Sequence, residues 1–291
     1  MRSAAAVHTT PAAAARAAIR AGTHTAPTSG LAPGYAQANL VVLPEAFAID
    51  FLRFCVRNPI ACPLLEVTDT GSPRAAGLAE DADIRTDLPR YRVLHRGICT
   101  DEPADISRYW RPDLVGFLLG CSFTFEWALE AEGLPLRHQM QGVNVPMYIT
   151  DRPCRAAGPF DGPMVVSMRP LPRCDVARAI EVTARFPAMH GRPVHVGDPA
   201  ALGIADLDVP DFGGPVAPDE GDVPVFWACG VTPQVVAQRA RLPLAIFHAP
   251  GHMFITDRMH AHYDSAASED IEQLQEDTGE RRAEDPTHHQ G

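Results

Sequence analysis

Two cysteines stand where chemistry could occur, because each ends an apolar run and precedes a pattern typical of a helix. Cys121 ends the run that starts at Leu114, and Cys229 ends the run that starts at Val223. A thiol at a helix N-terminus has a lowered pKa and can act as a nucleophile or a base. The competing interpretation is that both are small, buried, apolar residues at strand ends. We take Cys121 and Cys229 as candidate catalytic residues.

The turns after these cysteines supply hydroxyl groups and backbone amides. Ser122 and Thr232 are expected N-caps, and Pro233 is expected to begin the second helix. Unpaired amides at a helix N-terminus lie at the positive end of the helix dipole and bind anions. In an open α/β sheet such turns lie beyond the carboxyl ends of the strands, where ligands bind. We therefore expect Ser122 and Thr232 to bind substrate in one shared crevice, with both strands in one sheet.

A carboxyl group and an imidazole are the candidates for proton transfer. Glu126 lies one turn into the first helix, among Phe123, Phe125 and Trp127. Burial among aromatic rings would raise its pKa and let it act as a general acid, whereas on the solvent face of the helix it would have no such role. His195 lies in a short apolar strand and, with an ordinary pKa of about 6.5, is the candidate base.

Histidine spacing also raises the question of a metal site. His248 and His252 enclose a Pro-Gly pair, which prevents the helix on which zinc proteases present two histidines. His195 and Asp198 could bind a metal or form an acid–base pair. The spacing is weak evidence, so we assign no metal and no cofactor.

All 25 basic residues are arginine, since the chain has no lysine. This excludes a pyridoxal phosphate Schiff base and a Walker-type phosphate loop. Arginine can hold a carboxylate in bidentate geometry. Arg57 and Arg169, beside prolines at element ends, are candidate clamps, although ion pairing within the protein is the commoner role of an arginine. Asn58, Asn144 and Ser167 complete the candidate substrate-binding residues.

Charge and cysteine content limit the partners and the location. The 36 acidic residues give a net charge of -11, which repels phosphate backbones and anionic lipid. The longest apolar stretch, Leu114 to Cys121, is far shorter than the roughly 20 residues of a membrane span. The seven cysteines lack the spacing of a secreted disulfide framework. We expect a soluble, cytoplasmic protein that acts on a small carboxylate, without nucleic-acid or membrane partners; a homo-oligomer is left open.

The elements that position these residues alternate between strands and helices. Strand-turn-helix patterns occur at 114–132 and 223–241, and further short strands lie between them. This alternation favours an α/β fold, with a mostly parallel sheet covered by helices on both faces and a smaller α+β unit inserted in the middle of the chain. The expected divisions are a flexible N-terminus at 1–10, a main domain at 11–132 and 223–264, the inserted unit at 133–222, and a disordered acidic tail at 265–291.

Several blocks of residues, in one order from Ala12 to Asp257, match a known set. The blocks are Arg57–Pro59, Cys62–Thr68, Gly120–Phe123, Asn144–Tyr148, Gly158–Phe160, Gly162–Arg169, His190–Gly191, Pro193–His195, Phe226–Gln234 and Pro250–Asp257. Together they resemble the bacterial putative hydro-lyase family, which is related to the first domain of mitochondrial D-glutamate cyclase.

The resemblance implies a carbon–oxygen lyase, and more narrowly an enzyme that removes water from D-glutamate to give 5-oxo-D-proline. The resemblance supplies no catalytic residues, so the candidate site residues above are inferred only from their positions at the ends of strands and helices. A non-catalytic binding protein for a small carboxylate and a metal-dependent dehydratase are the alternatives. An enzyme needs a proton-transfer residue at reacting distance, whereas a binding protein does not. Chelation would abolish the activity of a metal-dependent dehydratase and of no other candidate.

Overall fold

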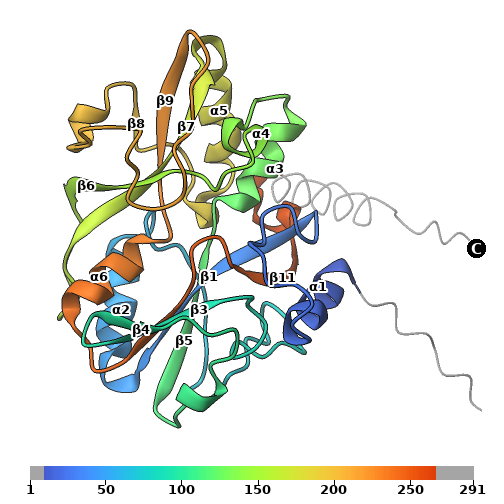
Figure 1. Ribbon diagram of the computed structural model, residues 1–291, viewed down its shortest axis with the longest axis vertical. Coiled ribbons are helices and arrows are strands. Elements are labelled where there is room, and N and C mark those ends of the chain that lie inside the picture. Colours follow the sequence, from blue (N-terminus) through green and yellow to red (C-terminus); the bar gives the residue numbers. More distant parts are fainter. Residues whose placement is uncertain (1–9, 267–291) are drawn as a thin grey trace, which may run out of the picture.

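The computed structural model describes residues 10–266 (Figure 1). The expected flexible N-terminus and acidic tail therefore lie almost wholly outside the described residues. Between Thr10 and Ala266, no helix combines the length and apolarity needed to cross a bilayer. The division of the chain into a main domain and an inserted unit stays a prediction.

The strands form two sheets. The seven-stranded sheet has the order β2-β5-β1-β10-β3-β4, with β11 also paired to β1, and the four-stranded sheet has the order β6-β7-β9-β8. The strands of the larger sheet are β1 (Tyr35–Pro44), β2 (Leu64–Val67), β3 (Tyr91–His95), β4 (Ile98–Asp101), β5 (Leu114–Gly120), β10 (Ala245–His248) and β11 (Phe254–Met259). Those of the smaller sheet are β6 (Met147–Pro153), β7 (Pro163–Pro172), β8 (His195–Val196) and β9 (Asp222–Ala228).

The expected mostly parallel sheet is wrong, because the strand pairs in both sheets are antiparallel. In the larger sheet the decisive strand is β1, which the sequence analysis did not identify. It lies at the centre of the larger sheet, antiparallel to both β5 and β10, with Val41 opposite Phe117 and Phe247. The expected alternation of strands and helices also fails elsewhere, because β3 and β4, and likewise β6 and β7, follow one another without a helix between them and pair antiparallel.

Six α-helices cover the sheets within the described residues (Figure 1). They are α1 (Pro11–Arg20), α2 (Glu45–Arg57), α3 (Phe123–Ala131), α4 (Arg137–Met140), α5 (Val176–Ala184) and α6 (Thr232–Ala240). Short 3-10 helices are η1 (Ser107–Tyr109), η2 (Arg173–Asp175), η3 (Pro187–Met189), η4 (Pro199–Leu202) and η5 (His260–Tyr263). The two helices that matter most for the site, α3 and α6, each follow a buried strand directly.

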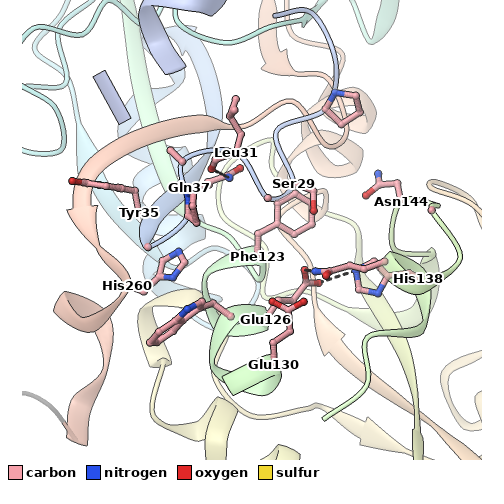
Figure 2. A pocket seen from close by; sticks show the side chains of 18 of the residues that line it. Ser29, Leu31, Tyr35, Gln37, Phe123, Glu126, Glu130, His138, Asn144 and His260 are labelled. Carbon is pink, nitrogen blue, oxygen red and sulfur yellow. Dashed lines mark hydrogen bonds and ion pairs between the residues drawn. The ribbon is translucent and has the colours of Figure 1, made fainter. Parts of the chain in front are cut away.

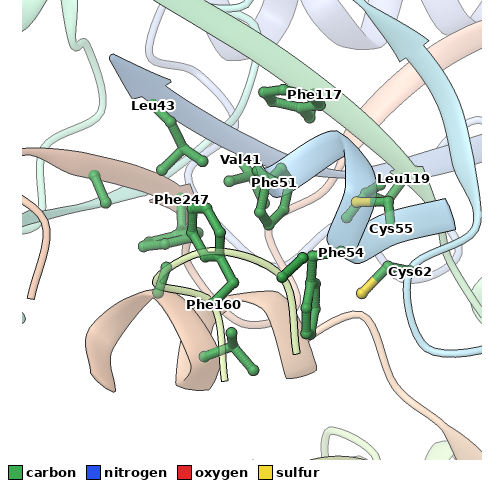
Figure 3. Close-up of a cluster of buried hydrophobic side chains, with 14 of the residues drawn as sticks. Val41, Leu43, Phe51, Phe54, Cys55, Cys62, Phe117, Leu119, Phe160 and Phe247 are labelled. Atoms are coloured by element: carbon green, nitrogen blue, oxygen red, sulfur yellow. The ribbon is translucent and has the colours of Figure 1, made fainter. Parts of the chain in front are cut away.

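One apolar cluster joins parts of both sheets and fixes α6 in place (Figure 3). Phe51 of α2 contacts Phe117 of β5 and Phe160, with ring centroids 4.8 and 5.1 Å apart. Val236 of α6 and Ala228 of β9 belong to the same cluster. Burial of such side chains, each worth about 1.5–3 kcal/mol for the larger ones, therefore holds the β9–α6 turn against the larger sheet.

Candidate active site

The turn between β5 and α3 and the turn between β9 and α6 line one small inner cavity of about 30 Å³. Cys121 and Ser122 come from the first turn, and Cys229 and Gly230 from the second. The two strands belong to different sheets, so the expectation that both lie in one sheet is wrong. The turns nevertheless meet, because the sheets pack on each other through the shared apolar cluster.

Close backbone approach explains the glycine in each turn. A Cβ on Gly120 would lie 1.9 Å from the Ala188 carbonyl oxygen, and a Cβ on Gly230 would lie 2.2 Å from Nδ2 of Asn39. Asn39, from β1, donates through Nδ2 to the Gly120 carbonyl at 2.6 Å. Asn39 therefore touches both turns and fixes their separation. The sequence analysis missed this residue because it missed β1.

Burial keeps both cavity thiols protonated. It raises the pKa of Cys229 to about 11 and that of Cys121 further, although the amide N–H groups of Val231 and Phe123 oppose the effect. At neutral pH these thiols can donate a proton, and the expected low-pKa thiolate is not what this environment favours. All seven cysteines are free thiols.

Two histidines that the sequence analysis did not propose line the inner cavity. Burial lowers the pKa of both His190 and His248 to about 4, so both are neutral at pH 7. Nδ1 of His190 lies 2.8 Å from the Ile60 carbonyl. When Nδ1–H donates to this carbonyl, Nε2 carries the lone pair and can accept a proton. His248 ends β10, so the strand-end reasoning applied to the cysteines could have found it.

Behind the cavity wall lies a buried ionic network centred on Arg169 of β7. Its Nε donates to Oε1 of Glu126 at 3.0 Å, and its Nη2 bonds to the same oxygen. Nη1 donates to Ser167 Oγ and Nη2 to Ser122 Oγ, both at 3.1 Å. The Arg169 side chain is fully buried. Arg169 therefore holds the β5–α3 turn and α3, and its donors are largely occupied by the protein itself.

The charge state of Glu126 differs from the expectation. Burial alone would raise its pKa, but the positive charge of Arg169 and the neighbouring His138 outweigh burial and lower the pKa to about 2. Gln139 also donates to Oε2 at 3.1 Å. Glu126 is thus a carboxylate at neutral pH, so the expected role as a protonated general acid is not supported. Sequence neighbours such as Phe125 suggested an apolar setting, but Arg169, which is 43 positions away in the sequence, determines the charge state of Glu126.

A larger outer cavity of about 530 Å³ adjoins the inner one (Figure 2). The two share Phe123 and Asn144 as lining residues, so Asn144 lies where a substrate-binding residue was expected. The outer cavity is bounded by the loop that precedes β1, by α3 and by α4. The inner cavity can take a group the size of a water molecule or a carboxyl oxygen, and the outer cavity can take the rest of a small substrate.

Thr232 has a structural role other than the expected cap. The α6 helix begins at Thr232 itself, with Val231 in the N-cap position and no side-chain cap. The Thr232 hydroxyl donates to the Cys229 carbonyl at 2.7 Å and accepts from Val165 N–H at 3.0 Å, which ties the turn to β7. Ser122 does occupy the N-cap position of α3, but its side chain makes no capping bond.

Three other candidates lie away from both cavities. Asn58 accepts from Arg155 N–H at 2.8 Å, and Arg57 donates to the Ala156 carbonyl, so this pair joins the end of α2 to a loop. Nε2 of His195 lies 2.8 Å from the main-chain oxygen of Asp198. Across residues 10–266 there is no group of three or more His, Cys, Asp or Glu side chains arranged to hold a metal ion.

The sequence has relatives among known proteins. The family model described as "D-glutamate cyclase" matches residues 115–257. A "Putative hydro-lyase" of Rubrobacter xylanophilus is 67% identical over 253 residues, which are 87% of this chain and 98% of that protein. A second, from Geobacillus kaustophilus, is 58% identical over 84% of this chain and 92% of that protein. A nitrogen repressor-like protein from Methanococcus jannaschii superposes with a TM-score of 0.35 and 10% identity over 86% of this chain and 98% of that one.

Proposed function

We propose that this protein, which belongs to the D-glutamate cyclase family, removes water from D-glutamate to give 5-oxo-D-proline. Its curated relatives are named as putative hydro-lyases, which fits the loss of water. The reacting carboxyl group would enter the inner cavity. The remainder of the substrate would lie in the outer cavity, past Asn144.

The observation that carries this proposal is the meeting of two helix N-termini at one uncharged cavity. The side chains that line the inner cavity include no Asp, Glu or Arg. Amide groups of the turns at Ser122 and Gly230 lie at the positive ends of α3 and α6. Such amides favour a carboxyl group and, more strongly, the oxyanion that forms when the carboxyl carbon is attacked, by roughly 3 kcal/mol per donor in measured cases.

The same cavity contains groups suited to the two proton transfers. In the reaction, the substrate amine attacks its own γ-carboxyl carbon, a carbon–nitrogen bond forms, and a carbon–oxygen bond breaks. Before the attack, the substrate ammonium passes one proton to the carboxylate; during the attack, the amine loses a second proton to a base, and the leaving hydroxyl gains one and departs as water. Neutral His190 can accept a proton, and the protonated thiol of Cys229 can donate one. These residues replace His195 and Glu126 in the roles that the sequence suggested.

The test is incubation of the purified protein with a panel of D- and L-amino and hydroxy acids, followed by mass spectrometry. We expect a product lighter by one water from D-glutamate, at higher yield than from L-glutamate. A chelator should leave the yield unchanged. Loss of activity on chelation would indicate the metal-dependent dehydratase instead. Tight binding of D-glutamate without conversion in either direction would contradict the proposal and identify a binding protein.

A further inference from the structure

The outer cavity has a negative wall. Glu126 and Glu130 lie one turn apart on α3 and both line the cavity, whereas no arginine is among its lining residues (Figure 2). Burial and the nearby charge of Glu126 raise the pKa of Glu130. Within residues 10–266, no hydrogen bond or ion pair involves the Glu130 side chain. Like charges at this spacing destabilise a helix, so a cation in the cavity would relieve the repulsion.

The same wall holds a buried histidine whose ring nitrogens lack hydrogen-bond partners among the described residues. His138 of α4 is 2% exposed and lines the cavity, and its Nε2 lies 3.3 Å from Oε1 of Glu126. Both ring nitrogens are buried and lack a hydrogen-bond partner among the described residues; Nε2 has the contact with Glu126, and Nδ1 has neither kind of contact. When Nε2–H points to the Glu126 carboxylate, Nδ1 carries a lone pair that requires an external donor.

We infer that this wall is an ammonium subsite, in which Glu130 pairs with the charge of a substrate amine and Nδ1 of His138 accepts one of its N–H groups. A primary ammonium group offers three N–H donors and one positive charge. The donors can satisfy Nδ1 of His138, and the charge can pair with the Glu130 carboxylate. Figure 2 shows Glu126, Glu130 and His138 together beside Phe123. The inference rests on the proposed function and adds the residues that select the substrate class.

The two cavities thus have complementary preferences along one short path. The inner cavity, lined by helix N-termini and no charged side chain, suits a carboxyl group, and the outer wall suits an amine. Phe123 and Asn144 belong to both cavities. The arrangement selects amino acids over dicarboxylic acids of the same length that lack the amine.

Calorimetric titration with D-glutamate and with glutarate, which differs only by the amine, measures this selection. Wild type should bind D-glutamate about tenfold more tightly than glutarate, the size expected for one hydrogen bond to a charged group. Glu130→Gln should bring the two affinities within about threefold by weakening D-glutamate alone. Glu130 is exposed, so the variant should fold, which circular dichroism checks. Glu132→Gln, at the C-cap of the same helix but paired with Arg178 outside the cavity, should keep the wild-type ratio.

Equal affinity of the wild type for the two ligands, or an unchanged ratio in Glu130→Gln, would overturn the ammonium subsite even if D-glutamate is converted. Selective binding that Glu130→Gln abolishes would support the subsite even if no water is lost, in which case the proposed reaction alone fails. Absence of binding by either ligand would overturn both.

Discussion

Replacing Arg169 with methionine is expected to lower the free energy of unfolding by about 3–5 kcal/mol, the range for breaking a buried ion pair from one side. The substitution keeps most of the side-chain volume but leaves the Glu126 carboxylate buried with only His138 and Gln139 as partners. It also removes the donors to Ser122 and Ser167. Urea unfolding followed by circular dichroism measures the change.

The same ion pair predicts a dependence of stability on pH. The pKa of Glu126 falls from 4.5 to about 2 on folding, so its contribution to stability is fully present above about 4.5 and is lost as the pH falls toward 2. In Arg169→Met this acid-induced loss should shrink, because the carboxylate is no longer stabilised. Arg178→Met, which removes an exposed pair with Glu132, should cost far less stability, because solvent screens exposed ion pairs. Equal costs for the two arginine variants would contradict the role given to Arg169.

Gly230→Ala is expected to reduce turnover by about 100-fold, as removal of one oxyanion donor does in other enzymes. The new Cβ would lie 2.2 Å from Nδ2 of Asn39, so the turn or the asparagine must move. Because Asn39 also holds the Gly120 carbonyl, the displacement changes the distance between the two helix N-termini. Steady-state kinetics with D-glutamate measures the loss, and thermal unfolding confirms that the variant remains folded.

Gly162→Ala is the matched control for this substitution. Its Cβ would lie 3.1 Å from Cδ of exposed Arg239 and 3.2 Å from Cγ2 of buried Val236, so each neighbour needs to move by only a few tenths of an ångström. None of these residues lines the inner cavity. Turnover should therefore stay close to that of the wild type. If Gly162→Ala and Gly230→Ala lose activity equally, or if Gly230→Ala retains full activity, the inner cavity is not where the reaction occurs.

Local features of the fold could be predicted from the sequence, because they depend on residues close together in the chain. The β5–α3 and β9–α6 units were both expected, since an apolar run, a small residue and a helical pattern follow one another directly. Sheet order could not be derived in this way. The pairing of β1 with β5 joins residues about 80 positions apart, such as Asn39 and Leu119, and no local pattern specifies it.

The candidate site shows the same division. Cys121, Ser122 and Cys229 were proposed from their places at strand ends and turns, and Asn144 as an asparagine close to a proline; all four line the inner cavity. The ion-pair partner of Glu126 could not be predicted, because Arg169 comes from β7 in the four-stranded sheet and is brought to α3 only by the fold. His138 was overlooked for a similar reason, since only the packing of α4 against α3 brings its ring to the Glu126 carboxylate.

The most direct test of the account is a crystal structure of the protein with 5-oxo-D-proline bound. The account predicts that the lactam oxygen of the product, which derives from the reacting carboxyl group, lies in the inner cavity. There it should accept hydrogen bonds from backbone N–H groups of the turns at Ser122 and Gly230, with the ring nitrogen facing the outer cavity. Product bound away from both turns, or no bound product at millimolar concentration, would contradict the assignment of this cavity as the active site.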